Sequence, residues 1–241
     1  MPLSLPKGIL FDLDDTILSA YGRPEAAWRK VAQAFVPRIA PVAADELALL
    51  INDVAREFWA DAARHKEWRA KLGEARREIV RRGCAGLGFS SDLIAAMADR
   101  FTLLRDEEMA LFPGACETLD ELKARGVRLA LITNGSSEVQ RAKITRFALG
   151  HRFEHIQIEG EHGFGKPEER AYLHAMQALG VTAPDTWMIG DNLEWEVVAP
   201  QRLGIYAIWI DVHGDGLPAD STVRPDRIIR SLTELLPDQA A

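Results

Sequence analysis

Two aspartates spaced two residues apart follow a short apolar run near the start of the chain. The run covers residues 8–11, and Asp12 and Asp14 come directly after it, with Asp15 next. Such a run indicates a buried strand, in which alternate side chains point to the same face, so Asp12 and Asp14 would share one side of the chain. Carboxylates about 4 Å apart repel by roughly 4 kcal/mol at an effective dielectric near 20, so the pair needs a cation, a shared proton or stored strain. A divalent metal ion is the simplest answer, and a solvated strand end before a turn is the alternative.

Three further polar motifs follow in chain order, each where a parallel strand would end or a helix would begin. They are Leu131-Ile132-Thr133-Asn134-Gly135, Gly165-Lys166-Pro167 and Ile189-Gly190-Asp191-Asn192. In the first, the hydroxyl and backbone N–H groups of Thr133 and Asn134 can point at phosphate oxygens with a helix N-terminus behind them, and Gly135 lets the chain come close. An ordinary Asn-Gly turn is the alternative, and the position after an apolar strand disfavours it.

Together the four motifs resemble those of the haloacid dehalogenase superfamily, most of whose members are aspartate-based phosphatases. The resemblance runs from Gly8 to about Trp209, apart from an insert. It implies that Asp12 is the nucleophile, because a carboxylate can attack phosphorus and form an aspartyl-phosphate. It also implies that Asp14 donates a proton to the leaving oxygen and later takes one from water, and that Lys166 neutralises the nucleophile and the phosphate.

The same resemblance implies a Mg²⁺ ion, held by the Asp12 side chain, the backbone carbonyl of Asp14 and the side chain of Asp191. Oxygen ligands and an open, hydrated coordination sphere suit this ion. Glu196 stands five positions after Asp191, where many relatives have a second Asp. The sequence leaves open whether Glu196 binds the metal or orients a metal-bound water, and we expect Gly135 and Asn192 to support the site from just outside it.

These motifs require strands and helices in strict alternation. We expect an α/β core with a doubly wound parallel sheet, whose ligand crevice lies at the carboxyl ends of the strands. After the first strand, the apolar patterns predict further strands at 127–132, 156–159, 187–189, 206–210 and 225–229, and helices at 117–125, 138–147, 168–179 and 194–203, followed by a terminal helix capped by Ser231.

Between residues 20 and 105 the apolar residues recur only at helical spacing, which predicts a four-helix insert without strands. In the superfamily resemblance this is the position of a helical cap. We therefore expect a catalytic core of residues 1–19 and 106–241 and a cap domain of residues 20–105. The insert is rich in arginine, and we expect most of these side chains on a solvated face with one or two facing the cleft: Arg64, Arg69, Arg76, Arg77, Arg81 and Arg82.

Composition narrows the class of partner. The 241 residues carry a net charge of −7, which argues against non-specific attraction to nucleic acid or anionic membranes. The superfamily resemblance implies that the partner is a small phosphorylated metabolite. No segment has the length of apolar sequence that a membrane span needs. Cys84 and Cys116 have no metal or redox spacing, so we expect two reduced thiols and a cytoplasmic protein. We expect the protein to be a monomer or a homodimer.

The histidines are expected to lie outside any metal site. The spacings of His151, His155 and His162 match no standard zinc ligand set and no cysteine accompanies them, which favours surface or loop histidines. His213 follows a predicted strand end and is a candidate substrate contact.

The sequence thus favours a Mg²⁺-dependent phosphatase acting on a small phosphomonoester. A 2-haloacid dehalogenase or a phosphosugar mutase on the same fold is the alternative among enzymes. A halide leaving group needs no proton, so Asp14 disfavours the dehalogenase. A non-enzymatic phospho-acceptor signalling domain also clusters acids around Mg²⁺, but the long helical insert disfavours that class.

Overall fold

The computed structural model describes residues 4–35 and 42–236, which belong to two compact units. One unit combines Met1–Ser19 with Ala110–Ala241, and the other is Ala20–Met109. The second boundary lies after Met109 and not after Arg105, where the sequence placed it. The reason is that helix α5 (Ser91–Glu108) continues without a break through Glu108.

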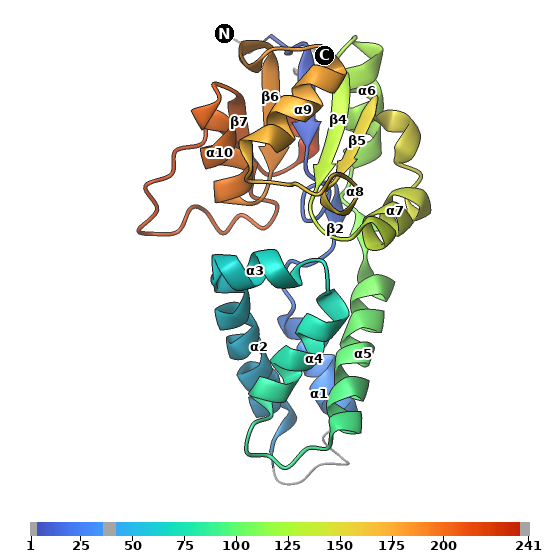
Figure 1. The fold of residues 1–241 in the computed structure, drawn as a ribbon, viewed down its shortest axis with the longest axis vertical. Coiled ribbons are helices and arrows are strands. Elements are labelled where there is room, and N and C mark those ends of the chain that lie inside the picture. Colours follow the sequence, from blue (N-terminus) through green and yellow to red (C-terminus); the bar gives the residue numbers. More distant parts are fainter. Residues whose placement is uncertain (1–3, 36–41, 237–241) are drawn as a thin grey trace. The chain divides into compact units, whose positions relative to one another are not determined.

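The first unit contains a six-stranded sheet in which every paired neighbour is parallel (Figure 1). The strand order is β5-β4-β1-β6-β7-β8, so the first strand lies inside the sheet and the chain winds outward in both directions. This is the expected α/β, doubly wound architecture. The strands are β1 (Gly8–Phe11), β4 (Arg128–Thr133), β5 (His155–Ile158), β6 (Thr186–Gly190), β7 (Tyr206–Ile210) and β8 (Arg227–Ile229).

The strand register brings the motifs to one edge of the sheet. Phe11, the last residue of β1, pairs with Leu131 of β4 and with Ile189 of β6. Strands β4 and β6 end shortly after these positions, at Thr133 and Gly190, so the motifs leave the sheet together at its carboxyl edge, where ligands bind in open α/β sheets. Strands β1, β4, β6 and β7 are mainly apolar, as expected of parallel strands that helices cover on both faces.

Helix α9 (Glu169–Leu179) forms the packing on one face. Tyr172 and Met176 pack against β-strand residues such as Leu10 and Met188, which are fully buried. The helix ends where Gly180 adopts a left-handed conformation (φ 63°), which glycine enters without a steric penalty. The other α-helices of this unit are α6 (Ala115–Ala124), α7 (Ser137–Arg146), α8 (Glu159–His162) and α10 (Ala199–Arg202).

Several local elements of this unit differ from the sequence-based expectation, among them the three that follow. The predicted helix 194–203 is a π-helix, η4 (Leu193–Val198), followed by α10, and the Ala199 N–H bonds to the Glu194 carbonyl five residues back. Pro200 has no N–H to continue an α-helical ladder, which explains the change of period. The terminal helix is a short 3₁₀ turn, η5 (Leu232–Leu235), and a two-stranded ribbon of β2 (Leu18–Ser19) and β3 (Ala110–Leu111) had no sequence signal of its own.

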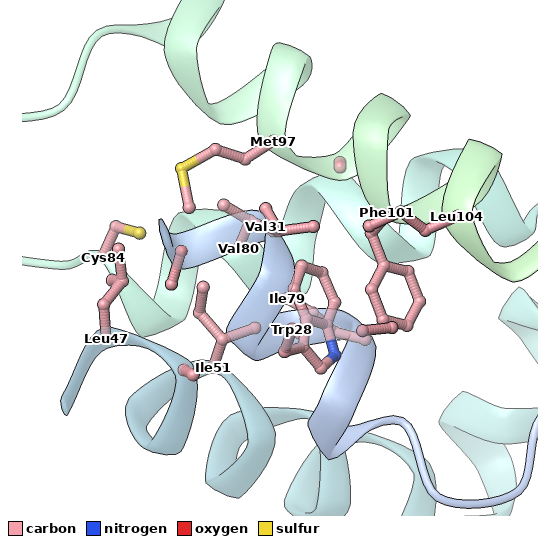
Figure 2. Packing of buried hydrophobic residues seen from close by; sticks show 14 of the residues in the cluster. Trp28, Val31, Leu47, Ile51, Ile79, Val80, Cys84, Met97, Phe101 and Leu104 are labelled. Carbon is pink, nitrogen blue, oxygen red and sulfur yellow. The ribbon is translucent and has the colours of Figure 1, made fainter. Parts of the chain in front are cut away.

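The regular secondary structure in the described part of the second unit is helical. It contains α1 (Glu25–Phe35), α2 (Ala44–Ala60), α3 (Ala62–Trp68), α4 (Leu72–Gly83) and α5. The prediction of four helices was wrong by one within the described residues, because Asp61 ends α2 and its side chain accepts the Arg64 N–H, starting the short α3. The core of this unit centres on Trp28 stacked on Phe101, with ring centroids 3.8 Å apart (Figure 2).

Candidate active site

Asp12 is the first residue after β1 and is held by three different groups. Its N–H donates to the Ile189 carbonyl of the neighbouring strand at 2.9 Å. One carboxylate oxygen accepts the Thr16 hydroxyl at 3.2 Å, and the other accepts Lys166 Nζ at 2.5 Å. With only 7% of its surface exposed, the Asp12 carboxylate is fixed by side chains that the sequence places 4 and 154 residues away.

Asp14 lies on the turn that follows. Asp15 has a positive φ of 55°, and its N–H bonds to the Leu18 carbonyl at 2.6 Å, so the chain reverses directly after Asp14. Lys143 Nζ contacts both Asp14 carboxylate oxygens, at 2.7 and 2.8 Å, and Gln140 Nε2 donates to one of them at 2.9 Å. The Asp14 side chain is therefore oriented by helix α7.

Sequence reasoning missed Lys143 and Gln140. Both are almost fully buried, although both lie on α7, where a polar residue is usually exposed. They are three residues apart, so they share one face of the helix, and Ser136 caps that helix directly after the Thr133 motif. The sequence signal that could have revealed them is a pair of polar residues at this spacing in the first two turns of the helix that follows the Thr133 motif.

The Thr133 motif and the Lys166 loop are tied to each other. Asn134 donates from Nδ2 to the Lys166 carbonyl at 2.8 Å and accepts the Lys166 N–H with Oδ1 at 2.9 Å. A Cβ on Gly165 would lie 2.4 Å from Asn134 Oδ1, so only glycine permits this approach. In the described chain Asn134 serves to fix the lysine loop, while Thr133 is buried and its hydroxyl accepts a hydrogen bond from Gln140.

Gly135 is also fixed by an acid that the sequence did not single out. Its N–H donates to Glu159 of α8 at 3.0 Å, and its carbonyl accepts the N–H of Gly160 at 3.0 Å. Gly135 has a φ of 110°, a region that side-chain-bearing residues rarely adopt. The short helix α8 thus braces the loop after β4.

Lys166 bridges two buried carboxylates. Its Nζ lies 2.5 Å from Asp12 and 2.7 Å from Glu196, and both Lys166 and Glu196 are 1% exposed. Burial opposes the charged lysine, but the two carboxylates outweigh it and raise the pKa of Lys166. Burial raises the pKa of Glu196 to about 7, with Lys166 opposing and Asp12 adding to the shift. Burial and Asp14 likewise raise the pKa of Asp12 against the effect of Lys166.

The π-helix delivers Glu196 to this position. Asn192 accepts the N–H groups of Glu194 and Trp195 and so begins the turn, and its own N–H donates to Glu196 Oε2 at 2.8 Å. A Cβ on Gly190 would lie 2.1 Å from Glu196 Cγ, so the glycine makes room for the acid. Asn192 and Glu196 therefore form one unit, with Glu196 directed at Lys166.

Asp191 leaves β6 at the same edge and remains accessible to solvent. Desolvation by its surroundings and the negative charges of Asp12, Glu196 and Asp15 raise its pKa well above the usual value. The site holds more carboxylates than ammonium groups: Asp12, Asp14, Asp191 and Glu196 against Lys143 and Lys166. This excess of oxygen donors and negative charge fits a hard divalent cation such as Mg²⁺.

Comparison with known proteins decides the family. A family model described as haloacid dehalogenase-like hydrolase matches residues 6–204. The chain belongs to the haloacid dehalogenase-like hydrolases. The alignment with a phosphoserine phosphatase of Thermus thermophilus is 29% identical and covers 95% of this chain and 97% of the relative. A glyceraldehyde 3-phosphate phosphatase of Methanocaldococcus jannaschii is 26% identical, with 95% of each chain covered.

Solved structures share the fold of this hydrolase. A haloacid dehalogenase-type hydrolase from Bacillus subtilis, whose structure holds magnesium, superimposes with a TM-score of 0.72 at 22% identity, covering 96% of this chain and 97% of the other. A 2-haloacid dehalogenase from Pseudomonas syringae superimposes with a TM-score of 0.58 at 24% identity over 96% of each chain. The structures that share this fold include a dehalogenase, whereas the sequence relatives are named phosphatases, so the site residues must distinguish the two activities.

The histidines of this hydrolase do not all follow the expectation. His151 is exposed, as predicted, and His213 is exposed in the turn after β7. His155 and His162, however, are half-buried and lie together with His174 of α9. Their sequence spacing carried no signal because the three residues come from β5, α8 and α9, which only the fold brings together.

The arginines of the helical unit divide into two groups: Arg77, Arg81 and Arg82 are exposed, as expected, whereas the other three are half-buried or buried. Arg76 donates to Thr102 at 2.9 Å and lies over the Phe101 ring, and burial lowers its pKa. Arg69 is 8% exposed. Arg64 and Arg82 lie over the Phe58 ring, while Arg77 pairs with Asp99 and Arg81 with Glu78.

None of the helices described in residues 4–35 and 42–236 has the length and apolar character needed to cross a membrane.

Proposed function

We propose that this hydrolase is a Mg²⁺-dependent phosphatase that cleaves a small phosphomonoester through an aspartyl-phosphate on Asp12. The observation that carries the proposal is the buried contact of Asp12 with Lys166, with Asp14 held separately by Lys143. Two carboxylates with different partners can take different roles in one reaction. The curated relatives support the assignment, because their names specify phosphatases of small phosphorylated metabolites.

In the first step an Asp12 carboxylate oxygen forms a bond to phosphorus while the bond from phosphorus to the leaving oxygen breaks. Asp14 donates the proton that the leaving oxygen needs, and Gln140 and Lys143 fix the position of the donor. Lys166 compensates the negative charge of Asp12 and of the incoming phosphate. The Thr133 loop ahead of α7 supplies backbone N–H groups near a helix N-terminus.

In the second step Asp14 takes a proton from a water molecule, whose oxygen attacks phosphorus and releases Asp12 and inorganic phosphate. The residues that would hold Mg²⁺ are Asp12, Asp191 and the backbone carbonyl of Asp14, with Glu196 supporting Lys166 and Asn192 from outside. The bound ion would supply charge neutralisation at the phosphate oxygens. Residues 20–109 would act as the cap domain.

The alternative that the fold allows is a dehalogenase. The structure contains a positioned acid, Asp14, for which release of a halide has no use, and this favours the phosphatase. The test is to assay the purified protein with p-nitrophenyl phosphate and, in parallel, with 2-chloropropionate. Phosphate release that stops after exhaustive chelation and returns with Mg²⁺, with no chloride release, supports the proposal. Chloride release, or undiminished phosphate release after chelation, contradicts it.

The substrate can be identified by assaying the purified protein with a panel of phosphorylated metabolites. Phosphoserine and glyceraldehyde 3-phosphate are included because the two relatives are named for them. The informative quantity is kcat/KM relative to p-nitrophenyl phosphate, since a physiological substrate should exceed this generic one.

A further inference from the structure

Three histidine side chains converge on the edge of the sheet where strand β5 meets helices α8 and α9. They are His155, His162 and His174, and one ring nitrogen of each lies within 4.8 Å of the other two. The ring centroids are 5.2 Å apart for His155 and His174 and 5.1 Å apart for His162 and His174. The proposed phosphatase chemistry uses none of them.

The hydrogen bonds that the structure shows for His162 and His174 engage one ring nitrogen of each, Nδ1, and not the other. His162 Nδ1 lies 3.1 Å from the Ile158 carbonyl, and His174 Nδ1 lies 2.7 Å from the Gln157 side-chain oxygen. An oxygen that accepts from Nδ1–H fixes the tautomer in which Nε2 carries a free lone pair, which is how proteins prepare histidine for metal binding. Within the chain described by residues 4–35 and 42–236, the buried His155 Nε2 has no hydrogen-bond partner.

We propose that His155, His162 and His174 form a binding site for a divalent transition-metal ion of the zinc class. Three imidazoles without a carboxylate are the ligands of Zn²⁺, Ni²⁺ or Cu²⁺ and not of Mg²⁺. Three histidines and one water complete the four-coordinate geometry of zinc. Ligands about 2.05 Å from a tetrahedral ion lie about 3.3 Å apart, so nitrogens now within 4.8 Å need only modest side-chain rotations.

The surroundings agree with this assignment. Burial lowers the pKa of His155, and His174 and His162 add to the effect while Gln157 opposes it, so the neutral ring that binds metals is favoured. Phe164 packs edge-on against both His162 and His174 and gives the site an apolar wall. The nearby cation Arg170 lies over the Phe164 ring and is paired with Glu168 at 2.8 Å.

The position of the site has a structural consequence. His162 ends α8 and His174 lies in α9, and the connection between these two helices carries Gly165 and Lys166. An ion shared by the three histidines would tie this connection to β5. Since α8 also braces Gly135, the same ion would stiffen both loops that contact the proposed phosphate site.

The experiment is a Zn²⁺ titration of the full chain with saturating Mg²⁺ present, so that the carboxylate site is occupied. Free Zn²⁺ is followed with a chromophoric chelator. The wild type and the control His151→Gln should each bind one Zn²⁺ more than His162→Gln and His174→Gln, or bind it at least tenfold more tightly. The melting temperature of the wild type should rise with Zn²⁺, and those of the two variants should not.

Co²⁺ gives a second readout that does not depend on a variant folding. Bound to three imidazoles it shows the intense visible absorption of a four-coordinate complex, whereas a carboxylate site gives the weak absorption of six-coordinate Co²⁺. Circular dichroism identifies a variant that fails to fold, and the other variant then decides. Equal Zn²⁺ stoichiometry and affinity in all folded proteins, or no four-coordinate Co²⁺ spectrum in the wild type, overturns the proposal.

Discussion

Asp14 is held by two side chains that belong to none of the four sequence motifs. Lys143 and Gln140 of α7 reach it across more than 120 residues of sequence, and both are buried. A buried polar contact of this kind fixes a side chain more firmly than an exposed one, because the alternative is an unsatisfied polar group. The structure therefore adds two side chains that hold in place the carboxylate of Asp14, which the sequence singled out.

The proposed role of Asp14 as the general acid predicts a dependence on the leaving group. Asp14→Asn should slow the hydrolysis of alkyl phosphates by roughly 10²–10⁴-fold, the usual contribution of a positioned general acid. Aryl phosphates should be affected less, because nitrophenolate leaves without a proton. Rates on both substrate classes measure this, and an unchanged alkyl phosphate rate would remove Asp14 from the mechanism.

Lys143→Met should show the same substrate dependence with a smaller amplitude, since it disturbs the position of Asp14 but leaves the acid present. Arg141→Met on the same helix is the matched control, because Arg141 pairs with Glu161 at the surface. Equal effects of the two substitutions, or equal effects on alkyl and aryl substrates, would assign Lys143 a purely structural role.

At the residue scale, sequence could place a candidate site residue where that residue follows a strand. Asp12 and Asp191 come directly after β1 and β6, and the register of a parallel sheet brings such positions together. Lys143 could not be singled out in this way, because a lysine on a helix is ordinarily solvated. The three-histidine cluster had no periodicity that would reveal it, since its members come from three elements.

At the scale of elements, the helical unit depends on aromatic packing between its first and last helices. Trp28 of α1 stacks on Phe101 of α5 with an interplanar angle of 12°, and both are buried. Apolar periodicity predicted that these helices exist. It did not predict the break at Asp61, because an N-cap signal competes with an apolar pattern that continues on both sides.

This packing gives a stability prediction. Phe101→Ala should lower the free energy of unfolding by about 3–5 kcal/mol, the usual cost of removing a buried aromatic ring and leaving a cavity. Leu103→Ala on the same helix should cost less than about 1 kcal/mol, because Leu103 is 54% exposed. Urea unfolding of both variants followed by circular dichroism measures this, and similar losses would contradict the packing argument.

The π-helix η4 shows why one element could not be read from apolar pattern alone. Its period changes so that Glu196 reaches Lys166, and Gly190 must be glycine for Glu196 to fit. Sequence indicated a helix at this place and an acid at position 196. The Glu196 side chain points toward Lys166 because of tertiary contacts, and the spacing of apolar residues along a helix does not predict such contacts.

At the scale of the whole molecule, the chain forms two units: a sheet unit that contains the carboxylates and an inserted helical unit. The alternation of strands and helices was sufficient to predict the parallel sheet, because short connections between such elements leave few topologies. The second domain boundary could not be placed by pattern, because α5 continues past the last apolar turn.

The charge of the proposed metal site gives a prediction for the stability of the whole protein. Mg²⁺ should raise the melting temperature of the wild type, since a ligand at about 100 times its Kd contributes about 2.7 kcal/mol. Asp191→Asn should lose this response. Without metal it should melt higher than the wild type, because one of several repelling carboxylates is gone. Thermal scans with and without chelator test both statements, and a full Mg²⁺ response in Asp191→Asn would contradict the site.

The most direct test of the proposed phosphatase is to find the phosphoryl group on Asp12. Asp14→Asn protein mixed with p-nitrophenyl phosphate and Mg²⁺ is quenched rapidly and measured by intact-mass and peptide mass spectrometry, because this variant should accumulate the intermediate. We predict one phosphoryl group per chain, on the peptide that contains Asp12. The double variant that carries both Asp14→Asn and Asp12→Asn, once shown to be folded, should carry no phosphoryl group. A phosphoryl group elsewhere, or wild-type turnover by Asp12→Asn alone, would contradict the account.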